Sequence, residues 1–158
     1  MRKKSKYKPK PVNCDNLTWV LSGMRTIANL PVAGTRLLAR NHAALDEILH
    51  GRGDKDHVDV LISALNIAET LCFMGIGVDW LDELLEAQNA LNSMATRGVS
   101  GKSFLFTGPE MQLVKVALAV HDEQLKVCTV KELEKALDIV EDFIRLGKAK
   151  KIKALETV

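Results

Sequence analysis

The chain has 158 residues, 47% hydrophobic, 27% charged and 4% aromatic, which suits one globular domain with an aliphatic core and excludes a disordered chain. Cys14, Cys72 and Cys128 form no CxxC motif, and the longest apolar run is residues 71–78, so we expect a cytosolic protein without a secretory signal or membrane span. The net charge of +2 conceals a basic chain at each end of an acidic body.

Residues 1–12 carry six basic side chains and no acidic one, and two prolines lie among them. We predict a flexible basic arm over 1–12, a single helical domain over 13–147 and a basic tail over 148–158. Residues 13–144 carry eleven basic and nineteen acidic side chains. The basic side chains of the arm and the tail, with one tyrosine among them, are Arg2, Lys3, Lys4, Lys6, Tyr7, Lys8, Lys10, Lys148, Lys150, Lys151 and Lys153.

A first helix is predicted after the arm. Asp15 is a good N-cap, and Pro31 forbids the helix from continuing past it. The apolar positions that recur at helical spacing between them are Leu17, Val20, Leu21, Met24 and Ala28.

Residues 31–40 show no clear hydrophobic period, and we predict a loop there, with a short extended piece at 35–38. Asn41 can cap a short second helix that runs to His50. The glycines at 51 and 53 are turn signals that end this helix.

Asp54 caps a longer helix, in which residues 58–74 are apolar apart from one narrow polar stripe. This pattern predicts a central helix that other helices almost surround. Glycines 75 and 77 end the helix, and Asp79 is predicted to cap the next one, which extends to Gly98. The buried stripe of that next helix is predicted to be Leu81, Leu84, Leu85, Leu91 and Ala95.

Two capping boxes open the last helices. Thr107 with Glu110, and Thr129 with Glu132, place a hydroxyl and a carboxylate where each satisfies a free backbone N–H of the first turn. Gly147 is a C-terminal stop signal. The predicted buried rows are Leu113, Val116, Ala117 and Val120 in one helix and Val130, Leu133, Leu137, Val140 and Ile144 in the other. The fold class predicted is therefore all-α, a compact bundle of about six helices.

Several short stretches resemble a group of uncharacterised small proteins encoded by tailed bacteriophages and prophages of Gram-negative bacteria. The stretches that carry the resemblance are residues 2–11, 18–20, 41–45, 59–62, 66–69 and 129–134. The resemblance extends over most of the chain and implies a protein made in the cytoplasm of an infected bacterium. It implies no activity and no site residues.

Residues 98–103, Gly-Val-Ser-Gly-Lys-Ser, are similar to the end of a phosphate-binding P-loop. Such a loop needs a glycine at position 96, where this chain has Thr96, and it needs a preceding strand, where this chain has a predicted helix. We therefore predict a connection between helices here.

Asp54, Asp56, His57 and Asp59 are side chains of metal-binding type close together in sequence. Acidic residues in the first turn of a helix also cap free N–H groups and complement the helix dipole. The sequence offers no second pair of ligands at helical spacing, and we predict a structural role for the four residues and no metal site.

His121 and Asp122 lie in the middle of a helix, where adjacent side chains point about 100° apart and cannot pair directly. We predict a partly buried, hydrogen-bonded His121 and a Cys72 that fills the core. No catalytic residue and no cofactor is predicted. A small metal-dependent enzyme built around His57 and His121 is the weakest of the functional alternatives.

The function predicted from the sequence is non-enzymatic. The chain is expected to bind a macromolecule of the host or the phage, with a protein partner favoured. The alternative is non-specific binding of DNA or RNA, in which the basic ends contact phosphates and Tyr7 stacks on a base. A homo-oligomer that covers exposed apolar residues such as Trp80 and 104–106 is a further possibility.

Overall fold

The computed structural model of the chain describes residues 24–27 and 31–148. This part of the chain contains five α-helices and one short 3₁₀ helix, η2. The predicted all-α class is confirmed there, while the first of the six predicted helices falls mostly outside the described residues. The α-helices are α2 (Pro31–Leu49), α3 (Lys55–Phe73), α4 (Leu81–Val99), α5 (Gly108–Val127) and α6 (Val130–Arg145), and η2 is Val78–Trp80.

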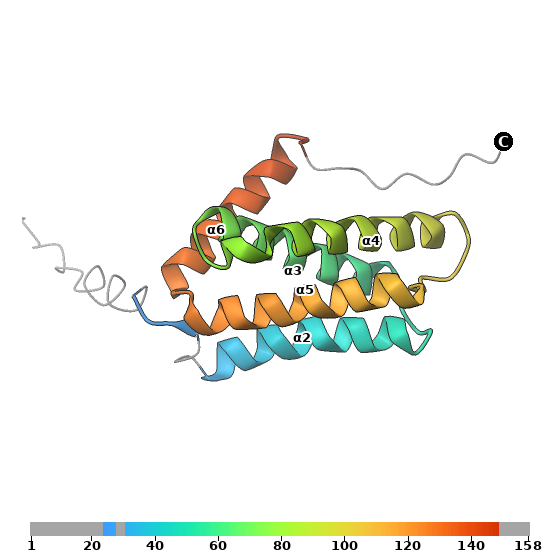
Figure 1. Ribbon diagram of the computed structural model, residues 1–158, viewed down its shortest axis with the longest axis horizontal. Helices are drawn as coiled ribbons and strands as arrows, with labels where there is room; N and C mark the ends of the chain where they lie inside the picture. The colour runs from blue at the N-terminus through green and yellow to red at the C-terminus, as the bar shows by residue number, and fades with distance from the viewer. Residues whose placement is uncertain (1–23, 28–30, 149–158) are drawn as a thin grey trace, which may run out of the picture.

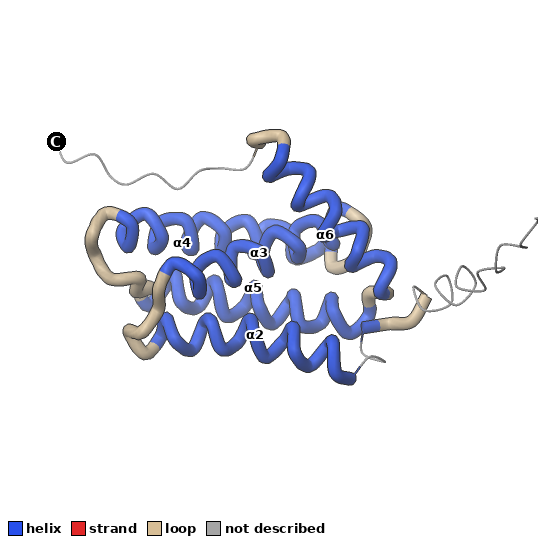
Figure 2. Tube along the Cα trace, turned by 180° about the vertical axis from the view of Figure 1, so that it is seen from behind, coloured by secondary structure: helices blue, strands red, loops and turns tan. Residues whose placement is uncertain are grey.

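Helices α2 to α5 form an up-and-down four-helix bundle, and α6 crosses one end of it obliquely (Figures 1 and 2). Short connections make each of α2, α3, α4 and α5 antiparallel to the next. The first half of α6 packs on α3, and its second half rises away from the bundle. The molecule therefore has a closed part and an overhanging part.

Helix α3 is the centre of the structure, as its narrow polar stripe predicts. It contacts α2, α4, α5 and α6, and Leu61, Leu65 and Leu71 along it are completely buried. Burial of one such side chain contributes about 1.5–3 kcal/mol to folding. The aliphatic core expected from the composition lies around this helix.

The predicted helix starts at Asp54, Thr107 and Thr129 are confirmed. The Thr107 hydroxyl accepts from the backbone N–H of Glu110 at 3.4 Å, and the Glu110 carboxylate accepts from that of Thr107 at 2.8 Å. Thr129 and Glu132 repeat the arrangement at 3.2 and 2.8 Å. At the end of α6, Gly147 has a φ of 67°, the left-handed conformation expected of a helix stop.

The loop and extended piece predicted for residues 31–40, and the cap predicted at Asn41, are wrong. Helix α2 begins at Pro31, where a proline is well tolerated because the first helical N–H has no partner, and runs through Asn41 to Leu49. Gly34 lies inside this helix, and its lack of a side chain lets Ile27 approach closely. A Cβ there would stand 3.1 Å from the carbonyl oxygen of Ile27. Packing against Ile27 has thus overridden the weak local signal.

Two other boundaries also differ from the prediction. Residues 24–27, which the predicted first helix includes, are not α-helical: Thr26 forms an isolated bridge with Thr129, and the Ile27 N–H donates to the carbonyl of Cys128 at 3.0 Å. Asp79 does not cap α4. It lies within η2, and Trp80, which makes no side-chain cap, precedes the first residue of α4.

Candidate functional site

The overhanging helix α6 is strongly amphipathic, but the bundle covers little of its apolar face. Val130, Leu133 and Val140 are partly buried against the core, and Ala136 is the one fully buried residue of the helix. The predicted burial of Leu137 and Ile144 is wrong, because the bundle covers only the row of Leu133, Ala136 and Val140 and leaves these two side chains 39% and 59% exposed. The predicted burial of Val116 in α5 is also wrong, since that side chain is 43% exposed. The exposed large apolar side chains of α6 and the residue after it are Leu137, Ile139, Phe143, Ile144 and Leu146.

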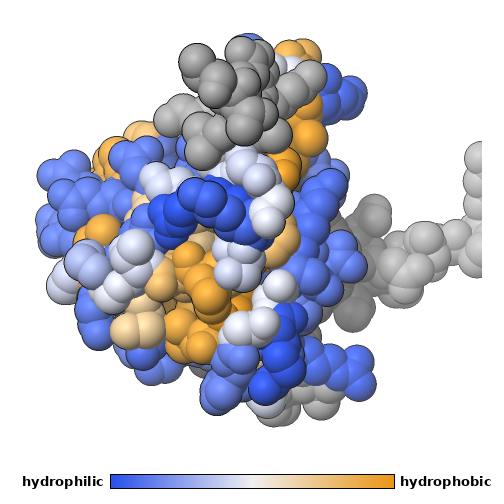
Figure 3. All heavy atoms as spheres, turned by 90° about the vertical axis from the view of Figure 1, so that its right-hand side faces the viewer, coloured by the Kyte–Doolittle hydropathy of each residue, from blue (hydrophilic) through white to orange (hydrophobic). Residues whose placement is uncertain are grey.

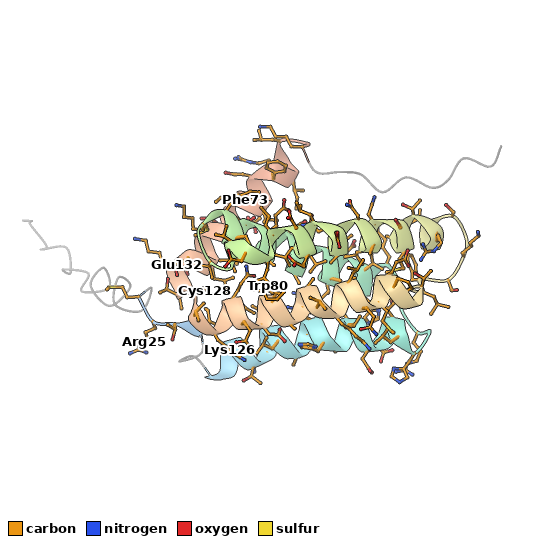
Figure 4. The ribbon with its side chains drawn as sticks, in the orientation of Figure 1. Arg25, Phe73, Trp80, Lys126, Cys128 and Glu132 are labelled. Carbon is orange, nitrogen blue, oxygen red and sulfur yellow. The ribbon has the colours of Figure 1, made fainter. Side chains whose placement is uncertain are left out.

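A groove of about 610 Å³ lies between this face and the seam of α3 and α4. Phe73 is 71% exposed although it belongs to the central helix, and Leu85 on α4, which the sequence predicts to be buried, is also exposed. Figure 4 shows Phe73 where α6 passes the bundle. The apolar side chains that line the groove are Ile62, Phe73, Met74, Leu85, Leu91, Ile139, Val140, Phe143 and Ile144.

Polar side chains of α3 and α4 also line the groove. The Gln88 amide of α4 donates to the Glu69 carboxylate at 2.8 Å and to the backbone carbonyl of Leu65 at 3.3 Å. These bonds fix the side chains of Gln88 and Glu69 against the bundle. Asn89 and Asn92 are exposed on the α4 side and offer amide groups to an incoming chain.

The charged side chains that line the groove are two lysines and one glutamate, Lys135, Lys148 and Glu69. Lys148 is the one predicted nucleic-acid contact that falls among the described residues, and its Nζ lies 5.9 Å from the centroid of the Phe143 ring. Neither lysine forms an ion pair with another residue in 24–27 or 31–148. The groove is therefore apolar with a positive balance of charge.

Among the predicted chemical residues, His121 is buried completely rather than partly. The Gln124 amide donates to the carbonyls of Ala68 and Ile76 at 3.0 and 2.8 Å, so its oxygen accepts from His121 Nδ1, at 3.4 Å. Burial lowers the pKa of His121 because it disfavours the charged ring. The imidazole is a neutral part of the core.

His121 and Asp122 do not pair, as predicted. Asp122 instead meets His42 of α2, with Asp122 Oδ2 and His42 Nε2 2.7 Å apart. The contact ties α5 to α2 on the outside of the bundle, with His42 exposed. Among the described residues, the hydrogen-bond partners of the two rings are the Asp122 carboxylate and the Gln124 amide, not a hydroxyl or a thiol.

Cys72 fills the core as predicted. Its thiol donates to the carbonyl of Gly77 at 2.9 Å, and burial raises its pKa. Cys128, at the junction of α5 and α6, is also buried, and desolvation raises its pKa to about 11. Figure 4 shows Cys128 near Glu132 and Arg25 at this end of the molecule. Neither sulfur is poised as a thiolate.

Asp54 and His57 act as helix caps. The His57 N–H donates to Asp54 Oδ1 at 3.1 Å, and the Asp54 N–H donates to His57 Nδ1 at 3.3 Å. The backbone hydrogen bond from His57 lowers the pKa of Asp54. Within residues 24–27 and 31–148, no three side chains of metal-binding type gather in one place.

Of the P-loop-like residues 98–103, the first two end α4 and residues 100–103 belong to the connection between α4 and α5. The Phe104 ring lies over Gly98, where an added Cβ would come within 2.1 Å of the ring. Phe104 and Phe106 are partly buried against the core, contrary to the exposure predicted for them, and Leu105 is exposed. Figure 3 shows apolar surface on this end of the molecule. The connection is a packed structural element.

The Arg97 guanidinium holds this connection in place. Its nitrogens donate to the Glu110 carboxylate, with Nη1 and Oε1 2.8 Å apart, and to the carbonyl of Leu105 at 3.1 Å. The hydrogen bond from Arg97 holds the pKa of Glu110 below its ordinary value. One carboxylate thus completes both a helix cap and a bidentate ion pair.

The remaining predicted nucleic-acid contacts, residues 2–10 and 150–153, lie outside the described residues. The groove, by contrast, was not predicted from the sequence. A signal for it exists, because Ile139, Phe143 and Leu146 form a second row at steps of four and three beside the row that begins at Leu133. Two rows on one helix indicate a face too wide for a single neighbour to cover.

Comparisons with family models, with curated proteins and with solved structures give no match to this chain. No helix in the described part of the chain is both long enough and apolar enough to cross a lipid bilayer.

Proposed function

We propose that the protein is a non-enzymatic binding protein and that its groove between α3, α4 and α6 receives an amphipathic helix of a partner protein. The observation that supports this most is the gathering of exposed apolar side chains on facing walls, Phe73 and Leu85 on one side and Phe143 and Ile144 on the other. Contiguous exposed apolar surface is typical of interaction sites.

The dimensions of the groove suit a helix. Its lining on α6 runs from Lys135 to Ile144, which corresponds to about 14 Å at the helical rise. About two and a half turns of a partner helix have the same length and present anchors at steps of three and four residues. Burial of each large apolar anchor would contribute about 1.5–3 kcal/mol to binding before the cost of association.

The proposed setting is the cytoplasm of an infected bacterium, and it rests on the resemblance to phage-encoded proteins. There the partner is a host or phage protein whose activity the bound state changes. The binding role needs no cofactor and no catalytic residue.

The experiment compares three tagged proteins purified from the native bacterial host: the wild type, Phe143→Asp and Val127→Asp. Phe143 and Val127 are 53% and 63% exposed, but Val127 is not a groove residue. A stoichiometric partner, identified by mass spectrometry, should accompany the wild type and Val127→Asp and be lost from Phe143→Asp. Recovery of the same proteins with all three, or of none with any, would refute the groove as a protein-binding site.

The charge distribution supports a second candidate, binding of DNA or RNA through the basic ends. Removal of residues 1–12 takes away six basic side chains. If they contact phosphates, the truncated protein should bind duplex DNA more weakly, and its salt dependence should be flatter by about 0.9 for each lost contact. Equal affinity and equal salt dependence of the intact and truncated proteins would exclude this candidate.

A further inference from the structure

We infer that the helix received by the groove is acidic, carrying carboxylates on both flanks of its apolar face. This inference rests on the proposed function and names the chemistry of the partner. It comes from the lysines at the groove and from the surfaces that enclose it.

The first support is charge. Lys135 on α6 and Lys148 just after its end both line the groove, and neither forms an ion pair with another described residue. The one carboxylate of the lining, Glu69, is already bound by the amide of Gln88 at 2.8 Å. A bound helix would therefore meet two lysines and one carboxylate, a net positive charge in the lining of the groove.

The second support is the surroundings of Lys148. Its ammonium lies near the face of the Phe143 ring, which places the cation directly beside an apolar anchor point. The sequence continues with Lys150, Lys151 and Lys153, which add positive charge after the end of α6. Carboxylates next to the apolar anchors of a partner helix would be attracted to this end, and lysines would be repelled.

The shape of the groove favours a helix over a membrane surface. An amphipathic helix that binds a bilayer presents its apolar face outward to a flat surface. Here side chains of α6 line the groove together with side chains of α3 and α4, so a partner must fit between elements of the protein. A single partner helix meets that condition.

The experiment uses the full chain and three fluorescent probe peptides of about 18 residues, each with the same leucines at helical spacing. The flanking positions are all glutamate, all glutamine or all lysine. The glutamate peptide should bind best and the lysine peptide worst, and added salt should reduce the difference. Similar binding of all three would refute the acidic preference while the proposed function stands. Binding of none would refute both.

Charge reversal locates the preference. The double variant Lys135→Glu with Lys148→Glu should weaken binding of the glutamate peptide by about tenfold and improve binding of the lysine peptide. The matched control is Lys115→Glu with Lys126→Glu, two exposed lysines of α5 that do not line the groove, and it should leave the order of the peptides unchanged. An equal effect of the two double variants would show general attraction by net charge and overturn the inference.

Three other occupants are tested with the same proteins. A wild-type dimer in sedimentation equilibrium that Phe143→Asp dissociates would assign the groove to a second copy. If residues 13–23 occupy the groove, they compete with the peptide. The full-length variant Leu17→Asp with Leu21→Asp would then bind the glutamate peptide at least about tenfold more tightly than the wild type does. Tighter binding to anionic vesicles than to the glutamate peptide would assign it to a membrane. Any of these results overturns the inference.

Discussion

Helices α5 and α6 begin alike and end differently. Each opens with a Thr and Glu capping box and continues with an apolar period, yet α5 is enclosed by α2, α3 and α4 while α6 contacts mainly α3. Of the large apolar residues of α6, none is fully buried. Local signals thus form both helices, but only the number of neighbours decides whether an apolar face belongs to the core or to a surface.

The largest expected difference between the closed bundle and the overhanging helix is in unfolding free energy. Leu65 of α3 is completely buried, whereas Leu137 of α6 is 39% exposed. Leu65→Ala should lower the free energy of unfolding by about 2–5 kcal/mol, and Leu137→Ala by less than about 1 kcal/mol. Urea denaturation measures both. An equal loss would mean that a neighbour covers the face of α6 in solution, and the comparison would fail.

A smaller loss of unfolding free energy is expected at Gly98, where a neighbouring ring lies close to the backbone. Gly98→Ala pushes a Cβ against the Phe104 ring and should cost about 1–3 kcal/mol of unfolding free energy. Gly108→Ala, at a position with no atom within 4 Å of the added Cβ, is the matched control and should be neutral or slightly stabilising. Thermal unfolding followed by circular dichroism compares them, and equal melting temperatures would contradict the packing described for Gly98.

The free energy of unfolding should also depend on pH, because a histidine is buried inside the closed bundle. Burial lowers the pKa of His121 below 6.5, so the unfolded chain takes up a proton at a pH where the folded chain does not. Stability should therefore fall as the pH drops below about 6.5, by at most about 1.4 kcal/mol for each pH unit, until the folded histidine is protonated. Urea denaturation at about pH 7.5 and about pH 5.5 measures the loss.

His121→Gln is the control for this loss, because it removes the titrating ring and keeps a polar side chain. Its stability should change less with pH than that of the wild type over the same interval. An unchanged slope would show that the loss of stability does not come from the titration of His121.

The sequence predicts most helix starts because each depends on a few neighbouring atoms. Thr107 with Glu110 and Thr129 with Glu132 satisfy free N–H groups of their own first turn, so no distant contact is needed to recognise them. The narrow polar stripe of α3 likewise predicts its central place. These parts of the fold could be read directly.

The parts that could not be predicted depend on contacts between distant segments. Helix α2 includes Gly34 and Asn41, both poor helix formers, and it is held by packing against Ile27 and by the contact of His42 with Asp122. The groove depends on the angle at which α6 leaves α3, which the apolar row of α6 does not determine. The sequence indicates that these apolar side chains pack against another surface, but it does not determine whether that surface belongs to the same chain.

The two buried thiols give the protein an internal reporter. With a pKa of about 11, Cys128 is a thiolate in only about one molecule in ten thousand at neutral pH. An alkylating reagent can modify Cys72 or Cys128 only when the surrounding helices separate. The rate at each cysteine, resolved by peptide mass mapping, therefore records how often the C-terminal end of α3 and the junction of α5 and α6 open. A ligand that steadies α6 would be visible as slower modification of Cys128 without any added label.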